Sequence, residues 1–305
     1  MRRGPPRLAE SVGVRMAKSK GDQYMDVISC PFCGAPEQEF ATSENGYNLV
    51  RCTSCALLFV SPRPALQSID EAARAGLHAT ERGRLKVVGR FEPKKVHFYR
   101  DRIESLFGQD ALAGKDISWL DIGAGYGELV EAVGKIVLRP ERVMGLEPCI
   151  PKQRSAVKRG LNVQSINLSE LDTTFDVVSM INVFSHIPDP RSFLDSVARV
   201  VAPGGSLMLV TGNGADIPVG DLPRPLDLPD HLVFAGRRHL EVLLEDAGFR
   251  VHRVNEYPDF MPESRWLVAA KNLVKVLMGR QTRTMSRNGP FRSLFVRAIK
   301  AGQID

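Results

Sequence analysis

The chain has 305 residues, of which 43% are hydrophobic and 25% are charged, enough for one large or two smaller domains with a buried core. The net charge of +6 is a moderate basic excess that is compatible with an anionic small molecule, an acidic membrane surface or RNA, and selects none of them. No apolar run is long enough to span a membrane and no long apolar signal core is present, which predicts a cytoplasmic protein.

A basic tail over residues 1–25 contains several prolines, and we assign it no function. The segment that follows, residues 26–64, carries two close cysteine pairs in the pattern C-x₂-C-x₁₈-C-x₂-C, formed by Cys30, Cys33, Cys52 and Cys55. This spacing predicts a tetrahedral zinc ribbon, and four protein thiolates leave no open position, so the zinc would be structural. The alternative is four reduced cysteines without metal. Asn45-Gly46 predicts a hairpin turn between the pairs.

The next segment, residues 65–110, is expected to be a helical connector. Pro93 occupies the first-turn position of a helix over 94–107 whose apolar residues recur at helical spacing. We interpret the lysines and arginines of this helix as a solvated face rather than as a phosphate site.

Short apolar runs alternate with helical patterns across residues 111–258, which predicts a Rossmann-like, doubly wound and mostly parallel α/β sheet. The expected strands are 117–122, 142–147, 162–166, 175–182, 205–211 and 249–255, and the expected helices are 127–136, 151–159, 190–200 and 239–247.

A glycine-rich loop follows the first of these strands and contains Gly123, Gly125 and Gly127. Glycines here let the backbone approach a ligand closely. Asp121 precedes the loop and would repel a pyrophosphate, whereas it would attract a cationic ligand. Glu147, about 20 residues further on, ends the second strand, where an acidic residue binds ribose hydroxyls. The combination fits S-adenosylmethionine.

With F-D-V-V-S-M-I-N-V-F-S-H-I-P-D-P at 175–190 and V-A-P-G-G-S-L-M-L-V at 201–210, the chain resembles class I S-adenosylmethionine-dependent methyltransferases. The zinc ribbon followed by A-L-L-F-V-S-P-R-P at 56–64 is similar to methyltransferases of sugar and polysaccharide biosynthesis, including sugar C-methyltransferases. In those relatives the zinc module packs beside the methyltransferase domain and helps form the substrate cleft. The resemblance covers residues 28 to 255.

Two histidines are candidates for the chemistry. His231, in P-D-H-L-V-F, corresponds to a histidine that faces the substrate in the sugar methyltransferases, and we expect it to take a proton from the acceptor; the alternative is a buried loop residue. His186 is the weaker candidate. Further candidates are Asn182 and Asn213, as polar strand ends, and Asn167, for the adenine edge.

No convincing seventh strand follows Tyr257, so either the sheet is incomplete or the chain is truncated. Residues 259–305 are expected to form a basic helical segment, with helices at 266–278 and 291–301. These helices are compatible with peripheral contact at the inner face of an acidic membrane, or with capping the domain's own sheet.

The sequence therefore predicts a small-molecule methyltransferase acting on a hydroxyl, or a carbon, of a nucleotide- or lipid-linked sugar, with no DNA partner. One alternative is an RNA methyltransferase with a zinc site, which the all-cysteine ligand set and the absence of a basic aromatic strip disfavour. The other is a non-catalytic ribbon protein that binds a partner.

Overall fold

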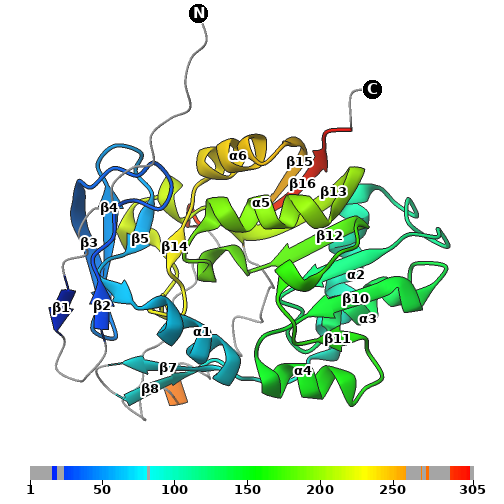
Figure 1. Ribbon diagram of the computed structural model, residues 1–305, viewed down its shortest axis with the longest axis horizontal. Helices are drawn as coiled ribbons and strands as arrows, with labels where there is room; N and C mark the ends of the chain where they lie inside the picture. Colours follow the sequence, from blue (N-terminus) through cyan, green and yellow to red (C-terminus); the bar gives the residue numbers. More distant parts are fainter. Residues whose placement is uncertain are drawn as a thin grey trace, which may run out of the picture.

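The computed structural model describes residues 16–18, 24–80, 83–258, 269, 273–274 and 289–302. Its centre is a seven-stranded sheet in the order β11-β10-β9-β12-β13-β16-β15 (Figure 1). The strands are β9 (Trp119–Ile122), β10 (Val143–Leu146), β11 (Val163–Gln164), β12 (Phe175–Ile181), β13 (Val201–Gly212), β15 (Phe249–Tyr257) and β16 (Ser293–Lys300). The predicted doubly wound sheet is confirmed.

Five strands, β9, β10, β11, β12 and β13, are parallel and bring their carboxyl ends to one edge of the sheet. All four residues of β9 are buried, as expected for a strand that has neighbours on both sides and helices on both faces. Asp121 on β9 pairs with Gly145 on one side and with Ser179 on the other, and it lies two residues before Gly123 of the glycine-rich loop.

The expectation of an incomplete sheet and of a helix over 291–301 is wrong. Ser293–Lys300 is β16, which lies between β13 and β15 and pairs antiparallel with both. Leu294, Phe295, Val296 and Ala298 are all buried, so this strand has an almost continuous apolar run instead of strict alternation. Such a run cannot be distinguished from a buried helix by periodicity alone. The expected helix at 266–278 lies almost entirely outside the described residues.

Helices cover both faces of the sheet (Figure 1). One face packs against α2 (Pro93–Phe107), α3 (Glu128–Gly134) and α4 (Ile150–Val157), and Pro93 is at the start of α2 as predicted. The other face packs against α5 (Pro190–Val200) and α6 (Arg237–Asp246). The core on this second face continues into the cysteine-containing segment, so the two parts share one set of apolar contacts.

The cysteine-containing segment forms a sheet in the order β14-β5-β4-β3. Its strands are β3 (Gln38–Glu44), β4 (Tyr47–Cys52), β5 (Leu58–Val60) and β14 (Val233–Phe234). The predicted hairpin turn is present, since Asn45 and Gly46 both have positive φ, 54° and 85°. The outermost strand, β14, comes from the loop after β13, far along the chain, so the ribbon and the larger domain share a sheet.

The connector contains a hairpin as well as helices. After α1 (Leu66–Ala75), a left-handed Gly76 leads into β7 (Leu77–Thr80), which pairs with β8 (Gly83–Lys86). A small three-stranded sheet is formed by β1 (Met16–Lys18), β2 (Tyr24–Asp26) and β6 (Arg63–Pro64). Among the described residues, no helix is both long and apolar enough to cross a membrane.

Candidate functional site

The glycine-rich loop connects β9 to α3, and its three glycines serve two purposes. All three have positive φ. A Cβ on Gly123 would lie 2.3 Å from Val183 Cγ2, and one on Gly127 would lie 2.5 Å from Leu161 Cδ1, so these two glycines are needed for packing. A Cβ on Gly125 would meet nothing within 4 Å. Gly125 therefore faces open space, as a ligand cradle requires.

Two carboxylates flank this loop. Ser179 Oγ donates a 2.7 Å hydrogen bond to Asp121 Oδ1, and burial raises the pKa of Asp121 to about 7. Glu147 accepts the Gly125 backbone N–H at 2.6 Å and the Cys149 N–H at 2.8 Å, so it ties the loop to the end of β10. Burial raises the pKa of Glu147 as well. A cation bound here would offset the cost of keeping both groups ionised.

The three candidate asparagines occupy different settings. Asn182 directly follows β12 with φ 55° and precedes Val183, which packs against Gly123 of the loop. Asn167 is exposed at the start of the short helix after β11. Asn213 donates its amide N–H to Pro290 O and accepts the Arg292 N–H, so its amide group fastens β13 to the segment before β16. An amide engaged in this way is not available to orient a substrate, which argues against the role predicted for Asn213.

A cluster of histidines surrounds Asp230 near the same edge of the sheet. His186, in the short helix that follows β12, has its Nδ1 2.7 Å from the backbone oxygen of Asp230 and 3.3 Å from Oδ1. The ring of His231 lies 4.7 Å from that of His186, centroid to centroid. The structure thus brings the two predicted histidines together. Burial raises the pKa of Cys149, and the charge of Asp230 adds to that shift.

The pKa values of His186 and His231 shift in opposite directions, because only His186 is hydrogen-bonded to Asp230. Burial disfavours the charged form of His186, but the hydrogen bond and charge of Asp230 outweigh it and raise the pKa of that imidazole. Burial next to His186 lowers the pKa of His231 to about 4. His186 is therefore the stronger base of the pair. The base role expected for His231 from the sequence stays a prediction.

Asp230 and His78 were missed in the sequence. Asp230 directly precedes His231, so its position in P-D-H was a usable signal. His78 lies on β7, and its Nε2 is 2.8 Å from Asp230 Oδ1. Nothing in the local sequence marks His78, because the contact spans about 150 residues and depends on how the hairpin packs.

The four ribbon cysteines converge as predicted. Cys30 Sγ lies 3.5 Å from Cys55 Sγ, and Cys33 Sγ lies 3.6 Å from Cys52 Sγ. Zn–S bonds of about 2.3 Å place the sulfurs of a tetrahedral site about 3.8 Å apart, close to these separations. The thiols are not paired in disulfides. The donor set and its dimensions therefore fit zinc.

The two cysteine knuckles share one backbone conformation. The N–H of Gly34 donates to Cys30 O, and the N–H of Ala56 donates to Cys52 O, both at 2.9 Å. Gly34 has φ 77° and Ala56 has φ 64°, so an alanine takes the left-handed position that glycine fills in the first knuckle.

The ribbon also contacts the segment that carries the histidine cluster. Val60 N–H donates to Leu232 O at 2.9 Å, and Asn45 donates its side-chain N–H to Leu228 O at 2.8 Å. Glu44 accepts the backbone N–H groups of Leu226 and Leu228. The ribbon thus fixes the loop on either side of Asp230 and His231.

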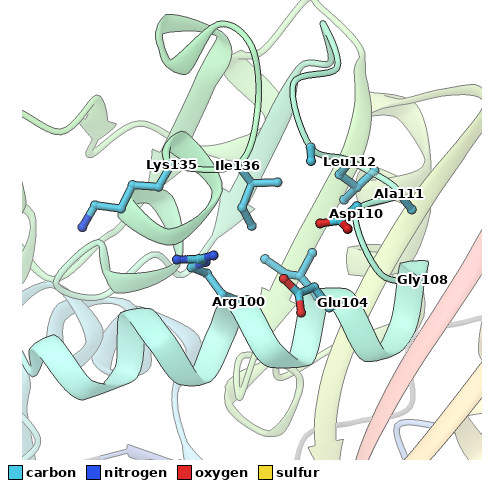
Figure 2. Close-up of a pocket in the computed structure, with 10 residues that line it drawn as sticks. Arg100, Glu104, Gly108, Asp110, Ala111, Leu112, Lys135 and Ile136 are labelled. Carbon is cyan, nitrogen blue, oxygen red and sulfur yellow. The ribbon is translucent and has the colours of Figure 1, made fainter.

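A separate hollow of about 110 Å³ lies between α2 and the turns around Asp110 and Ile136 (Figure 2). Arg100 and Glu104 of α2 and Lys135 after α3 line it, which leaves charges of both signs around the opening. Because α3 begins at the glycine-rich loop and ends here, the hollow is at the opposite edge of the sheet from the loop and the histidines.

Comparisons with known proteins agree on one family. A family described as a methyltransferase domain matches residues 91–254. The ubiquinone biosynthesis O-methyltransferase of Parvibaculum lavamentivorans is 29% identical over 215 residues, covering 62% of this chain and 84% of that protein. The corresponding enzyme of Methylobacterium nodulans is 30% identical over 209 residues, covering 60% and 82%.

Among solved structures, geranyl diphosphate C-methyltransferase from Streptomyces coelicolor is similar with a TM-score of 0.52 and 16% identity. The match covers 68% of this chain and 79% of that one. At this identity the likeness concerns the fold alone.

Proposed function

Because the chain belongs to the methyltransferase-domain family and is an S-adenosylmethionine-dependent methyltransferase, we propose that it methylates a hydroxyl group of a small molecule and that His186 removes the hydroxyl proton. The observation that carries the proposal is the contact of His186 Nδ1 with Asp230, at 2.7 Å from the backbone oxygen. With Nδ1–H facing Asp230, Nε2 retains the lone pair that accepts a proton.

The residues of the loop edge fit the cofactor. We propose that Gly125 leaves room for it, that Glu147 accepts hydrogen bonds from its ribose, and that Asp121 lies toward its cationic end. Asn167 and Asn182 stay as proposed contacts to the adenosine portion. When bound, S-adenosylmethionine supplies a methyl group on a positively charged sulfur.

A hydroxyl acceptor accounts for a base at this position. A neutral amine is already a good nucleophile, whereas a neutral hydroxyl is a weak one and becomes reactive as it loses its proton. Curated relatives are named as O-methyltransferases, which supports the same choice. His231, with its low pKa, is proposed as a neutral contact to the acceptor and not as its base.

We propose a sugar hydroxyl as the acceptor, because the zinc ribbon resembles that of the methyltransferases of sugar and polysaccharide biosynthesis. The relatives found by comparison act in ubiquinone biosynthesis according to their names, so phenolic hydroxyls form the competing class. The contacts of the ribbon support binding of the acceptor beside the histidine cluster, because they hold the backbone on both sides of Asp230. We propose that one structural zinc on the four cysteines holds it in shape.

The test is formation of S-adenosylhomocysteine with two acceptor panels, nucleotide-linked sugars and dihydroxybenzoates, followed by mass spectrometry of the methylated product. His186→Ala should lower turnover by roughly 10²-fold or more while cofactor affinity stays unchanged, the usual effect of removing a general base. His231→Ala should lower turnover less. Unchanged turnover in His186→Ala would show that alignment of the substrates suffices without a protein base.

A matched pair of glycine variants tests the cofactor cradle. Gly125 and Gly204 both have positive φ, and at both a new Cβ would meet nothing within 4 Å. Gly125→Ala should weaken S-adenosylmethionine binding at least 10-fold in calorimetry, because the Cβ enters the cradle. Gly204→Ala carries the same backbone strain near the start of β13, at the opposite edge of the sheet, and the protein should bind the cofactor normally. Equal affinity in both variants would remove the loop from the binding site.

A further inference from the structure

His78 makes a contact for which neither the zinc ribbon nor the cofactor site accounts. It lies on β7, in a hairpin that precedes the methyltransferase domain, and only 5% of its surface is exposed. Its Nε2 is 2.8 Å from Asp230 Oδ1, a short polar contact although the imidazole N–H is not aligned as a hydrogen bond to that oxygen. A buried imidazole facing a buried carboxylate is costly unless each compensates the other.

Asp230 Oδ1 is shared between two imidazoles. His78 approaches it at 2.8 Å and His186 at 3.3 Å, while the backbone oxygen of Asp230 contacts His186 separately at 2.7 Å. The two imidazoles come from different elements, the β7 hairpin and the short helix after β12. One carboxylate therefore divides its interaction between His186 and a second ring that is more deeply buried.

The hairpin that carries His78 is held at several points. Tyr47 of the ribbon donates its hydroxyl to Ala79 O at 3.1 Å, and the N–H of Val87 donates to Gly76 O at 3.0 Å. Gly76 is packed so closely that a Cβ there would lie 3.0 Å from Cys149 Sγ, two residues after Glu147. These contacts hold His78 in place against Asp230 from the ribbon side and from the cofactor side.

We infer that His78 is a positioning residue for the methyl transfer, which holds the Asp230 carboxylate and takes part of its charge away from His186. This inference rests on the proposed role of His186 as the base. The consequence is that His78 keeps His186 less basic than Asp230 alone would make it. A base that was protonated throughout the neutral range would accept no proton from the acceptor.

Other charged and titratable groups face this cluster, and the effect of His78 has to be measured against them. They come from three elements and comprise His231 beside His186, Lys152 of α4, and Cys149 and Glu147 at the end of β10. In the described part of the chain, none of these groups forms an ion pair with Asp230 Oδ1, so replacing His78 changes the environment of the carboxylate selectively.

The experiment is a titration of the imidazole Cε1–H signals by heteronuclear NMR in the full chain with zinc. The chain has six histidines, so single replacements assign each signal. His78→Phe should shift the pKa of His186 upward, because Asp230 then interacts with one imidazole only. His78→Gln, which restores a neutral donor, should return that pKa toward the wild-type value. His97→Gln, an exposed position on α2, is the matched control and should change nothing.

A double variant shows whether the effect passes through the carboxylate. In an Asp230→Asn background, His78→Phe should leave the pKa of His186 unchanged. With an acceptor in hand, His78→Phe should lower kcat at pH 7 and recover at higher pH, with the acidic limb of the kcat profile moved upward. Cofactor affinity should stay constant, because His78 does not contact the loop.

Three outcomes overturn the inference: an unchanged or lowered pKa of His186 in His78→Phe, an undiminished shift in the Asp230→Asn background, or a second tightly bound metal per chain. The last would mean that His186, Asp230 and His231, whose donor atoms lie within 4.8 Å, serve as ligands. Failure of the base proposal looks different: His186→Ala would then leave turnover unaffected, although His78→Phe would still shift the pKa of His186.

Discussion

Replacing Asp121 with asparagine should make the apoprotein more stable at pH 8 and less able to bind its cofactor. Asp121 is 4% exposed, and its pKa rises from 3.8 to about 7 on folding, mainly because burial disfavours the carboxylate. A raised pKa for an acid means that the folded state prefers the protonated form. The contribution of Asp121 to the stability of the fold is thus fully present below pH 3.8 and is lost as pH rises to about 7.

The magnitude follows from the pKa difference. About three units at about 1.4 kcal/mol per unit give a penalty on the order of 4 kcal/mol that is complete above pH 7. Asparagine cannot ionise, and its amide oxygen can still accept the hydrogen bond from Ser179 Oγ. Its buried N–H₂ group needs new partners, at a cost of about 1–2 kcal/mol. The net gain at pH 8 is then about 2–3 kcal/mol, and at pH 5 it is near zero or negative.

Urea unfolding of the cofactor-free protein at pH 5, 7 and 8.5 measures this directly. Because about one unit of the pKa difference already acts at pH 5, the loss of stability between pH 5 and 8.5 should shrink in Asp121→Asn by about 2.5–3 kcal/mol. Asp195→Asn, an exposed acid on α5, should retain the wild-type slope. Calorimetry should show S-adenosylmethionine binding about 10-fold weaker or more in Asp121→Asn, with less dependence on pH. An Asp121→Asn variant with the wild-type pH slope would refute the reasoning, because Asp121 would then be ionised in the fold at no cost.

Further predictions concern the zinc ribbon and the sheet. Protein purified without chelators should contain one zinc, which the Cys30→Ser/Cys52→Ser double variant loses and Cys149→Ser keeps; zinc retained by the double variant would exclude these ligands. Ala56→Gly should raise stability by up to about 1 kcal/mol in urea unfolding, because glycine adopts φ 64° without strain, and a loss would contradict the left-handed geometry. Phe295→Ala should cost about 3–5 kcal/mol, since this fully buried ring lies on β16; a surface-like cost would place the strand elsewhere.

Site residues whose positions are set by short spacings along the chain were predictable from the sequence. The glycine-rich loop, Asp121 and Glu147 are defined by spacing along a strand, a turn and a helix, and the structure brings them to one edge of the sheet. The same holds for the cysteine pairs, because each C-x₂-C turn alone sets how far apart its two thiols lie. In these cases the short-range geometry that the backbone permits already determines where the side chains lie.

Contacts between distant segments were not predictable from one sequence. β16 was interpreted as a helix because its apolar residues fit both periods, and only pairing with β13 and β15 resolves the ambiguity. The relative basicity of His186 and His231 depends on which of them meets Asp230, and that is decided by packing. The strand β14 has two residues, too few for any pattern, yet it joins the ribbon to the larger domain.

The position of β16 in the sheet has a consequence for how the chain acquires its fold during synthesis. The ribosome completes every other strand of the sheet before it makes Ser293–Lys300, and that last strand belongs between two of them. Until it emerges, β13 and β15 each have an edge with unpaired backbone groups. In the nascent chain these two edges must not pair with each other or with another chain. Removing residues 293–302 would therefore open the sheet in its interior and not at its border.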